Sequence, residues 1–380
     1  MIKNKKLLIG LMMSLTLLAG CLEQNIIEDL GIVTVYGVDQ GEDVGSIKGT
    51  TVIFQFNPDI TDASQIISSQ GQTFREMKKN ANKKSAYKIV SGQLRSILFG
   101  PEVAKDGIFP YLDPLDRDAA LSDLIFVAIA NEPAAEVLSA QNYEQAPNVG
   151  TYIQELLGAA VRSERIVSST LHEFIRNYFI VGQEPLVPIL SKKNNKVAID
   201  SIAIMKSDQQ VGTLSLDEIF YVRLFLKDFK AAEFQLELPI EVFKDYLEDY
   251  EVINRDELYV VMDKIYSNTK IKLVDPDALK FKVTVDMAGR IVELTERLNL
   301  QNKDVVKLME ENIQKSIKEN IQNVINKTQE LQADVYGFGK IYNSNIKDET
   351  LSHEKWRDMY PNIDVDVSVN MKIRSYGTVE

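Results

Sequence analysis

The sequence Ile363-Asp364-Val365-Asp366-Val367-Ser368-Val369-Asn370-Met371-Lys372-Ile373 alternates apolar and polar residues without interruption. Successive side chains of a β-strand point to opposite faces, so this pattern predicts a long strand with one buried and one solvated face. We expect antiparallel pairing, because antiparallel sheets commonly leave one face in water. Residues 281–285 repeat the alternation and predict another half-buried strand.

A long amphipathic helix is predicted between these strands, at about residues 303–333. Its apolar residues recur every three or four positions, which is the spacing of one helix face. They are Val306, Met309, Ile313, Ile317, Ile321 and Val324. We expect this stripe to form core on the sheet; the alternative is a surface that binds a partner. Strands on both sides of a long helix indicate an α+β domain.

The earlier part of the chain mixes shorter strands and helices. Apolar and β-branched runs predict strands at 32–38, 50–56, 97–99 and 124–130, and helical spacing predicts helices at 73–86 and 152–178. Residues 197–205 and 210–214 are typical of a hairpin, and Ser215, with Glu218 three residues on, predicts a helix start.

A polar stretch at residues 191–196 marks a domain boundary. We therefore expect an α+β protein with a three-domain, mixed α/β ectodomain, antiparallel sheets and a long helix in its last domain. The expected parts are a signal peptide (1–20), an N-terminal mixed α/β domain (21–190), a small middle domain (197–250) and a C-terminal α+β domain (251–380).

The first twenty residues are typical of a signal peptide. Three lysines precede an apolar stretch from Leu7 to Leu18, which is shorter than the ~20 residues of a membrane-spanning helix. Leu18-Ala19-Gly20-Cys21 follows and contains the single cysteine of the chain. It resembles a bacterial lipobox, so we predict cleavage between Gly20 and Cys21 and a diacylglycerol on the Cys21 thiol. The alternative is an ordinary secretory signal.

Composition and charge exclude several classes of protein. With 45% hydrophobic and 26% charged residues the chain is a folded protein, and a mean hydropathy of −0.13 excludes a polytopic membrane protein. A net charge of −12 argues against nucleic-acid binding. Removal of residues 1–20, with three lysines and no acid, leaves a charge of −15. We therefore expect the mature body to stand off an anionic membrane unless a partner holds it there.

Motifs of catalysis and metal binding are missing from the sequence. One cysteine and two histidines leave little material for a disulfide framework or a metal centre. His172-Glu173 begins like the zinc motif HExxH, but Arg176 replaces the second histidine. Gly337 and Gly339 suggest half of a dinucleotide fingerprint; we interpret them instead as the end of a helix. We therefore expect no catalytic residues, no metal and no cofactor.

Several segments, in this order along the chain, resemble the Ger(x)C family of spore-germination lipoproteins. They are residues 18–21, 27–33, 37–39, 71–74, 99–108, 115–118 and 333–339, together with Trp356 and the final alternating strand. Each segment is weakly specific alone, but the resemblance covers essentially the whole chain.

The resemblance implies a non-enzymatic C subunit of a nutrient germinant receptor. Such a protein would lie on the outer face of the spore inner membrane, held by lipid on Cys21 and bound to integral-membrane A and B subunits. Only Cys21 carries over as a functional residue. The runner-up is the substrate-binding lipoprotein of an ABC importer, which predicts two similar lobes around a ligand cleft; a secreted cell-wall enzyme is a third, weaker alternative.

Overall fold

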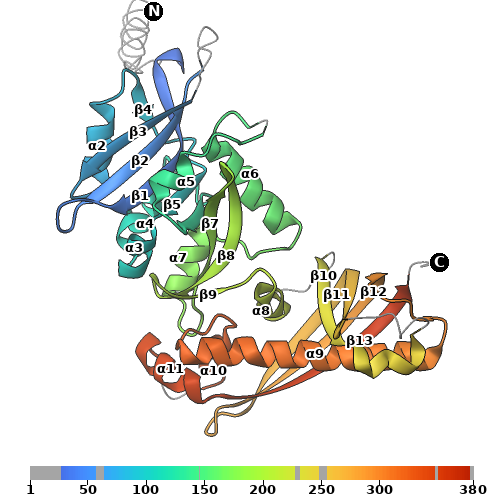
Figure 1. Ribbon diagram of the computed structural model, residues 1–380. Coiled ribbons are helices and arrows are strands. Elements are labelled where there is room, and N and C mark those ends of the chain that lie inside the picture. The colour runs from blue at the N-terminus through green and yellow to red at the C-terminus, as the bar shows by residue number, and fades with distance from the viewer. Residues whose placement is uncertain are drawn as a thin grey trace, which may run out of the picture.

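The computed structural model describes residues 27–56, 64–144, 146–226, 232–247, 255–346 and 350–376. Two sheets organise them (Figure 1). A nine-stranded sheet is built from residues 30–214, and a four-stranded sheet from residues 232–376. The mixed α+β class expected from the sequence is confirmed.

The first sheet has the order β3-β2-β1-β5-β6-β7-β8-β9, with β4 pairing on β1. Its strands are β1 (Leu30–Gln40), β2 (Ile47–Phe54), β3 (Ser64–Gly71), β4 (Lys88–Val90), β5 (Ser96–Phe99), β6 (Phe126–Ala130), β7 (Leu186–Lys193), β8 (Lys196–Lys206) and β9 (Gln209–Leu214). The β1–β4, β1–β5, β5–β6 and β6–β7 pairs are parallel and the others antiparallel. The sheet is therefore mixed, with antiparallel pairs at both ends and parallel pairs between them.

Helices cover both faces of this sheet. After η1 (Ile27–Asp29) they are α2 (Phe74–Asn82), α3 (Pro101–Asp106), α4 (Phe109–Asp116), α5 (Ala134–Leu138), α6 (Val149–Arg162) and α7 (Leu171–Phe179). Apolar residues of α5 and α6 share one core cluster, and those of α2, α3, α4 and α7 share the other. The helical pattern expected over 152–178 is thus two helices, because Thr170 and Glu173 form a capping box that begins α7.

The polar stretch at 191–196 is a hairpin turn within the first sheet. Asn194 and Asn195 have φ angles of 52° and 61°, which a tight turn between β7 and β8 requires. The segment 197–250, expected as a middle domain, is consequently shared between the sheets, since β8 and β9 extend the first and β10 belongs to the second. How the chain divides into independently folding domains stays a prediction.

The second sheet has the order β10-β11-β12-β13. Its strands are β10 (Ala232–Pro239), β11 (Glu257–Asp275), β12 (Lys280–Leu294) and β13 (Asp364–Tyr376). β13 pairs with β12 in parallel, with Val365 beside Phe281, so the antiparallel expectation for this strand was wrong. The physical reason is the long helix α9 (Lys303–Glu330), a crossover that returns the chain to the same end of the sheet.

Helix α9 packs its apolar stripe against this sheet, as predicted. Ile313, Ile317 and Ile321 are buried, and Val305 takes the buried place expected for Val306. The remaining helices are α8 (Glu218–Leu226), η2 (Ile240–Tyr246), α10 (Phe338–Asn345), α11 (His353–Met359) and η4 (Tyr360–Asn362). One apolar cluster runs from the α6 face of the first sheet through α8 to α9 and the second sheet, so the two halves share a core.

Candidate functional site between the two sheets

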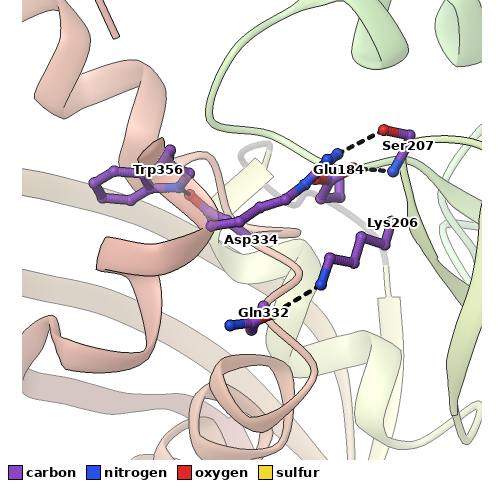
Figure 2. A network of polar contacts seen from close by, with 7 residues as sticks. Glu184, Lys206, Ser207, Gln332, Asp334 and Trp356 are labelled. Atoms are coloured by element: carbon purple, nitrogen blue, oxygen red, sulfur yellow. Dashed lines mark hydrogen bonds and ion pairs between the residues drawn. The ribbon is translucent and has the colours of Figure 1, made fainter. Parts of the chain in front are cut away.

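The residues that sequence analysis assigned to lipid attachment and cleavage, Gly20 and Cys21, lie outside the described residues. Of the two histidines, His172 is exposed on α7 and His353 begins α11. Within the described ranges, no three His, Cys, Asp or Glu side chains gather as a metal site would require. A network of buried polar side chains lies instead where the two halves of the chain meet (Figure 2).

Asp334 is the centre of that network. Its carboxylate is 1% exposed and accepts backbone N–H bonds from Tyr336 (3.1 Å), Gly337 (2.8 Å) and Gly339 (2.8 Å). The indole Nε1–H of Trp356 donates a fourth, at 3.0 Å. Burial raises the pKa of Asp334 to about 6, against these hydrogen bonds, which favour the charged form.

The two glycines of this turn open a helix, which corrects the interpretation of a helix end. Gly337 has φ +82° and precedes α10, whose first residue is Phe338. A side chain at Gly339 would collide with the backbone of Gly182, 2.4 Å away. Gly182 itself has φ +86°, a conformation that favours glycine. These glycines therefore let the loop before β7 approach the turn before α10.

A buried ion pair joins the two halves beside this turn. Glu184, 7% exposed, accepts from Arg357 Nε at 2.8 Å and from the backbone N–H of Ser207 at 2.6 Å. Arg357 Nη2 also donates to Ser207 Oγ at 2.6 Å, and the backbone N–H of Glu184 donates to the Asp334 carbonyl at 2.7 Å. Figure 2 shows Lys206 reaching Gln332 in the same region, at 2.8 Å. The loops that flank the first sheet are thus fixed to α11 and to the turn after α9.

A cavity of about 600 Å³ lies next to the ion pair. The first half contributes Arg176 and Gln183, and the second contributes Tyr336 and Lys340. Lys340 Nζ donates to Gln183 Oε1 at 2.8 Å, and its pKa is lowered, first by burial and then by the charge of Arg176. The Tyr336 hydroxyl is buried without a hydrogen-bond partner among the described residues. The lining thus mixes charged and polar side chains with apolar ones such as Ile166 and Phe225.

Sequence reasoning did not find this site. Glu184 and Arg357 carry no motif and are 173 positions apart. Two signals touched the site: Asp334 lies in the segment 333–339 that resembles the family, and an aspartate that precedes glycines commonly caps its own backbone. Trp356, which was quoted for the family resemblance, is the indole that binds this aspartate.

Both halves of the chain match families of spore germination proteins. Residues 23–192 match "Spore germination protein N-terminal domain", and residues 200–377 match "Spore germination B3/ GerAC like, C-terminal". The chain is 24% identical over 377 residues to spore germination protein GerQC of Bacillus cereus, covering 99% of this chain and 100% of that one. It is 28% identical over 380 residues to spore germination protein A3 of Bacillus subtilis (strain 168), covering 95% of each.

A solved structure has the same fold. The crystal structure of the GerBC protein superposes with a TM-score of 0.50 at 16% identity, over 89% of this chain and 97% of that one. At that identity the likeness concerns the fold alone. It extends over both sheets rather than over one.

Proposed function

Because the chain belongs to the Ger(x)C family of spore germination proteins, we propose that it is the lipid-anchored C subunit of a nutrient germinant receptor. The observation that carries the proposal is that both family domains match in order along one chain, directly after a lipobox-like sequence. In this role it would bind integral-membrane A and B subunits at the outer face of the spore inner membrane.

Lipid on Cys21 would supply the membrane attachment. Within the described ranges, no helix combines the length and the apolar character needed to cross a bilayer. Cys21 lies nine residues before Leu30, where β1 begins. A diacyl anchor at that distance would hold the first sheet close to the bilayer, since two acyl chains bind firmly where one is marginal.

We infer a binding role rather than catalysis. The shared core and the buried Glu184–Arg357 pair fix the two halves to one another, which suits a protein that holds membrane partners in place. An importer's binding protein would have two similar lobes, whereas the described residues form a nine-stranded sheet and a four-stranded sheet with the long helix α9 packed on it. That difference disfavours the importer.

The proposal is tested by deleting the gene in the spore former that carries it and exposing spores to single nutrients. We expect loss of the response to one nutrient class, restored by the wild-type gene but not by Cys21→Ala. Mass spectrometry of the mature N-terminus should show a diacylglyceryl cysteine. Unchanged germination together with failed uptake of a solute by growing cells would instead support the importer.

A further inference from the structure

β10 is an edge strand of the second sheet (Figure 1). In an antiparallel ladder every second residue bonds to the neighbouring strand, and the residues between them point their backbone N–H and C=O groups the other way. The backbone N–H of Ile240 donates to the Asp256 carbonyl at 3.0 Å, which places the even-numbered residues of β10 in the ladder with β11. Gln235 and Glu237 therefore present their backbone groups at the outer edge of the sheet.

This outer edge has no partner within the described parts of the chain. No described backbone or side-chain group bonds to the outward N–H and C=O groups of Gln235 and Glu237. Natural edge strands are commonly blocked by lysine, proline or a bulge. β10 has a register shift between Ala232 and Phe234 and a proline at its last residue, Pro239, but residues 234–238 contain neither lysine nor proline. Such an edge is a template on which another strand can add.

A groove of about 590 Å³ runs along this edge. Residues 235–239 all line it, so the groove follows the edge of the strand and not one of its faces. Its other wall is the flank of α9, where Asn312, Ser316 and Asn320 lie at successive turns. The amides of Asn312 and Asn320 donate to backbone carbonyls of their own helix, at 2.8 and 2.9 Å, so these side chains lie along α9. The groove thus places short polar side chains opposite an unpaired strand, which suits an extended polypeptide.

The groove is also acidic. Its lining carries four carboxylates and one ammonium group, which are Asp217, Glu237, Glu257, Glu319 and Lys315. Lys315 lies 4.0 Å from Glu319, and the other three carboxylates have no ion pair among the described residues. Burial, then the charges of Asp217 and Glu237, raise the pKa of Tyr221 on α8, so these two carboxylates act on the same part of the groove. A segment that enters here is expected to bring cations.

We propose that β10 accepts an additional strand from a partner protein, an extended segment that carries lysine or arginine at alternate positions. Glu233 and Glu237 are exposed on one face of β10, whereas Leu236 and Leu238 are buried on the other. Since side chains of a strand alternate between faces, the added strand would place its cations beside the glutamates and apolar residues beside the leucines. The inference deepens the proposed binding role and rests on it.

A second copy of this chain is a poor occupant of the same edge. Antiparallel pairing of two β10 strands about Gln235 would set Glu233 of each copy directly opposite Glu237 of the other. Like charges in directly opposed positions destabilise a strand pair. The acidic edge therefore favours a basic partner over self-association.

The test measures binding of the mature chain to a synthetic peptide of about eight alternating lysine and valine residues, an ordinary strand length. The control peptide has the same composition with its lysines grouped at one end, so a strand cannot keep them on one face. We expect the alternating peptide to bind at least roughly fivefold more tightly than the grouped one. Hydrogen exchange followed by mass spectrometry should show slower exchange of the Gln235 and Glu237 amides in the complex.

Three variants locate the binding. Glu237→Lys should weaken binding of the alternating peptide at least roughly fivefold, because it replaces attraction with repulsion. Asp277→Lys is the matched control, since it changes the net charge equally but lies in the exposed turn after β11, whereas β10 pairs with residues 257–265. It should change the affinity by less than about twofold. Gln235→Pro removes an outward N–H and leaves the ladder to β11 intact, so it should also weaken binding.

Equal affinity for the two peptides, or equal effects of Glu237→Lys and Asp277→Lys, would reduce the attraction to charge alone and overturn the proposal. Exchange of the Gln235 and Glu237 amides that is slow in the free chain would overturn it as well. Slow exchange only at high protein concentration would assign the edge to a second copy, and slow exchange at every concentration would mean that this chain covers the edge itself. None of these measurements uses spores, so their failure beside a germination defect in the deletion strain would reject the edge and leave the proposed function standing.

Discussion

Replacing Arg357 with methionine isolates the ion pair between the two halves, because methionine keeps an unbranched apolar stem and removes the guanidinium. Glu184 would still accept the hydrogen bond from the backbone N–H of Ser207, but its other carboxylate oxygen would lose the Arg357 donors. Because the Glu184 side chain is only 7% exposed, water cannot readily replace them. Removing one partner of a buried pair costs about 3–5 kcal/mol, because the remaining charge is left without compensation. We therefore expect Arg357→Met to lower the unfolding free energy by about that amount.

Urea unfolding of the mature chain measures this effect, and two further variants interpret it. Glu184→Gln in the Arg357→Met background should recover part of the loss, because the uncompensated charge is gone. Arg117→Met is the matched control: Arg117 pairs with Asp113, but its side chain is 76% exposed. Such exposed pairs contribute about 0–1 kcal/mol. A loss in Arg357→Met no larger than in Arg117→Met would refute the claim that burial makes this pair important.

Three other changes test the packing and the titration of the site. Ile317→Asp places a charge in the core between α9 and the sheet and should lower the unfolding free energy, measured in urea, by at least about 4 kcal/mol. The control Lys318→Asp, on the solvated side of α9, should lower it by under about 1 kcal/mol. Equal effects would mean that the apolar stripe is not core. In Gly182→Ala the new Cβ would lie 2.3 Å from the backbone of Gly339, at a residue whose φ is +86°. The variant should lose about 2 kcal/mol or more of unfolding free energy and melt at a lower temperature. An unchanged melting temperature would contradict the close approach of the two glycines. The pKa of Asp334 is raised from its ordinary value of 3.8 to about 6 in the folded state, so the folded state binds this proton more tightly than the unfolded state. The contribution of this proton to stability is therefore present at low pH and is lost as the pH rises through 6. Between pH 7.5 and pH 5 the wild type should gain about 1 kcal/mol relative to Asp334→Asn, and parallel pH profiles would show that Asp334 does not titrate there.

The elements with a regular pattern could be predicted from the sequence. Alternation identified β13, and a spacing of three and four identified α9, because each pattern follows from the burial of one face. The same alternation cannot encode the direction of the neighbouring strand, which explains the error at β13. Direction was set by α9, whose length carries the chain back before β13 begins.

The candidate site was beyond local reasoning. The polar stretch at 191–196 was predicted as a domain boundary; Asn194 and Asn195 favour turns, and a turn inside a sheet has the same composition as a boundary between domains, so composition alone does not distinguish the two. Glu184 and Arg357 look like ordinary surface charges, and only the packing of the two halves buries them.

The capping of α8 was predictable because Ser215 and Glu218 are near in sequence: Ser215 Oγ accepts from the Glu218 N–H at 3.0 Å.

The position of β13 in its sheet has a consequence for the order in which the molecule assembles during synthesis. All strands of the first sheet have been made by residue 214, so that sheet can close early, as N-terminal domains generally do. The second sheet must wait for its last strand, because β12 receives its parallel neighbour only from residues 364–376. Until Arg357 has left the ribosome, Glu184 also lacks its partner. A nascent chain paused before that point would display an unpaired sheet edge and an uncovered apolar face of α9, which are features that chaperones recognise.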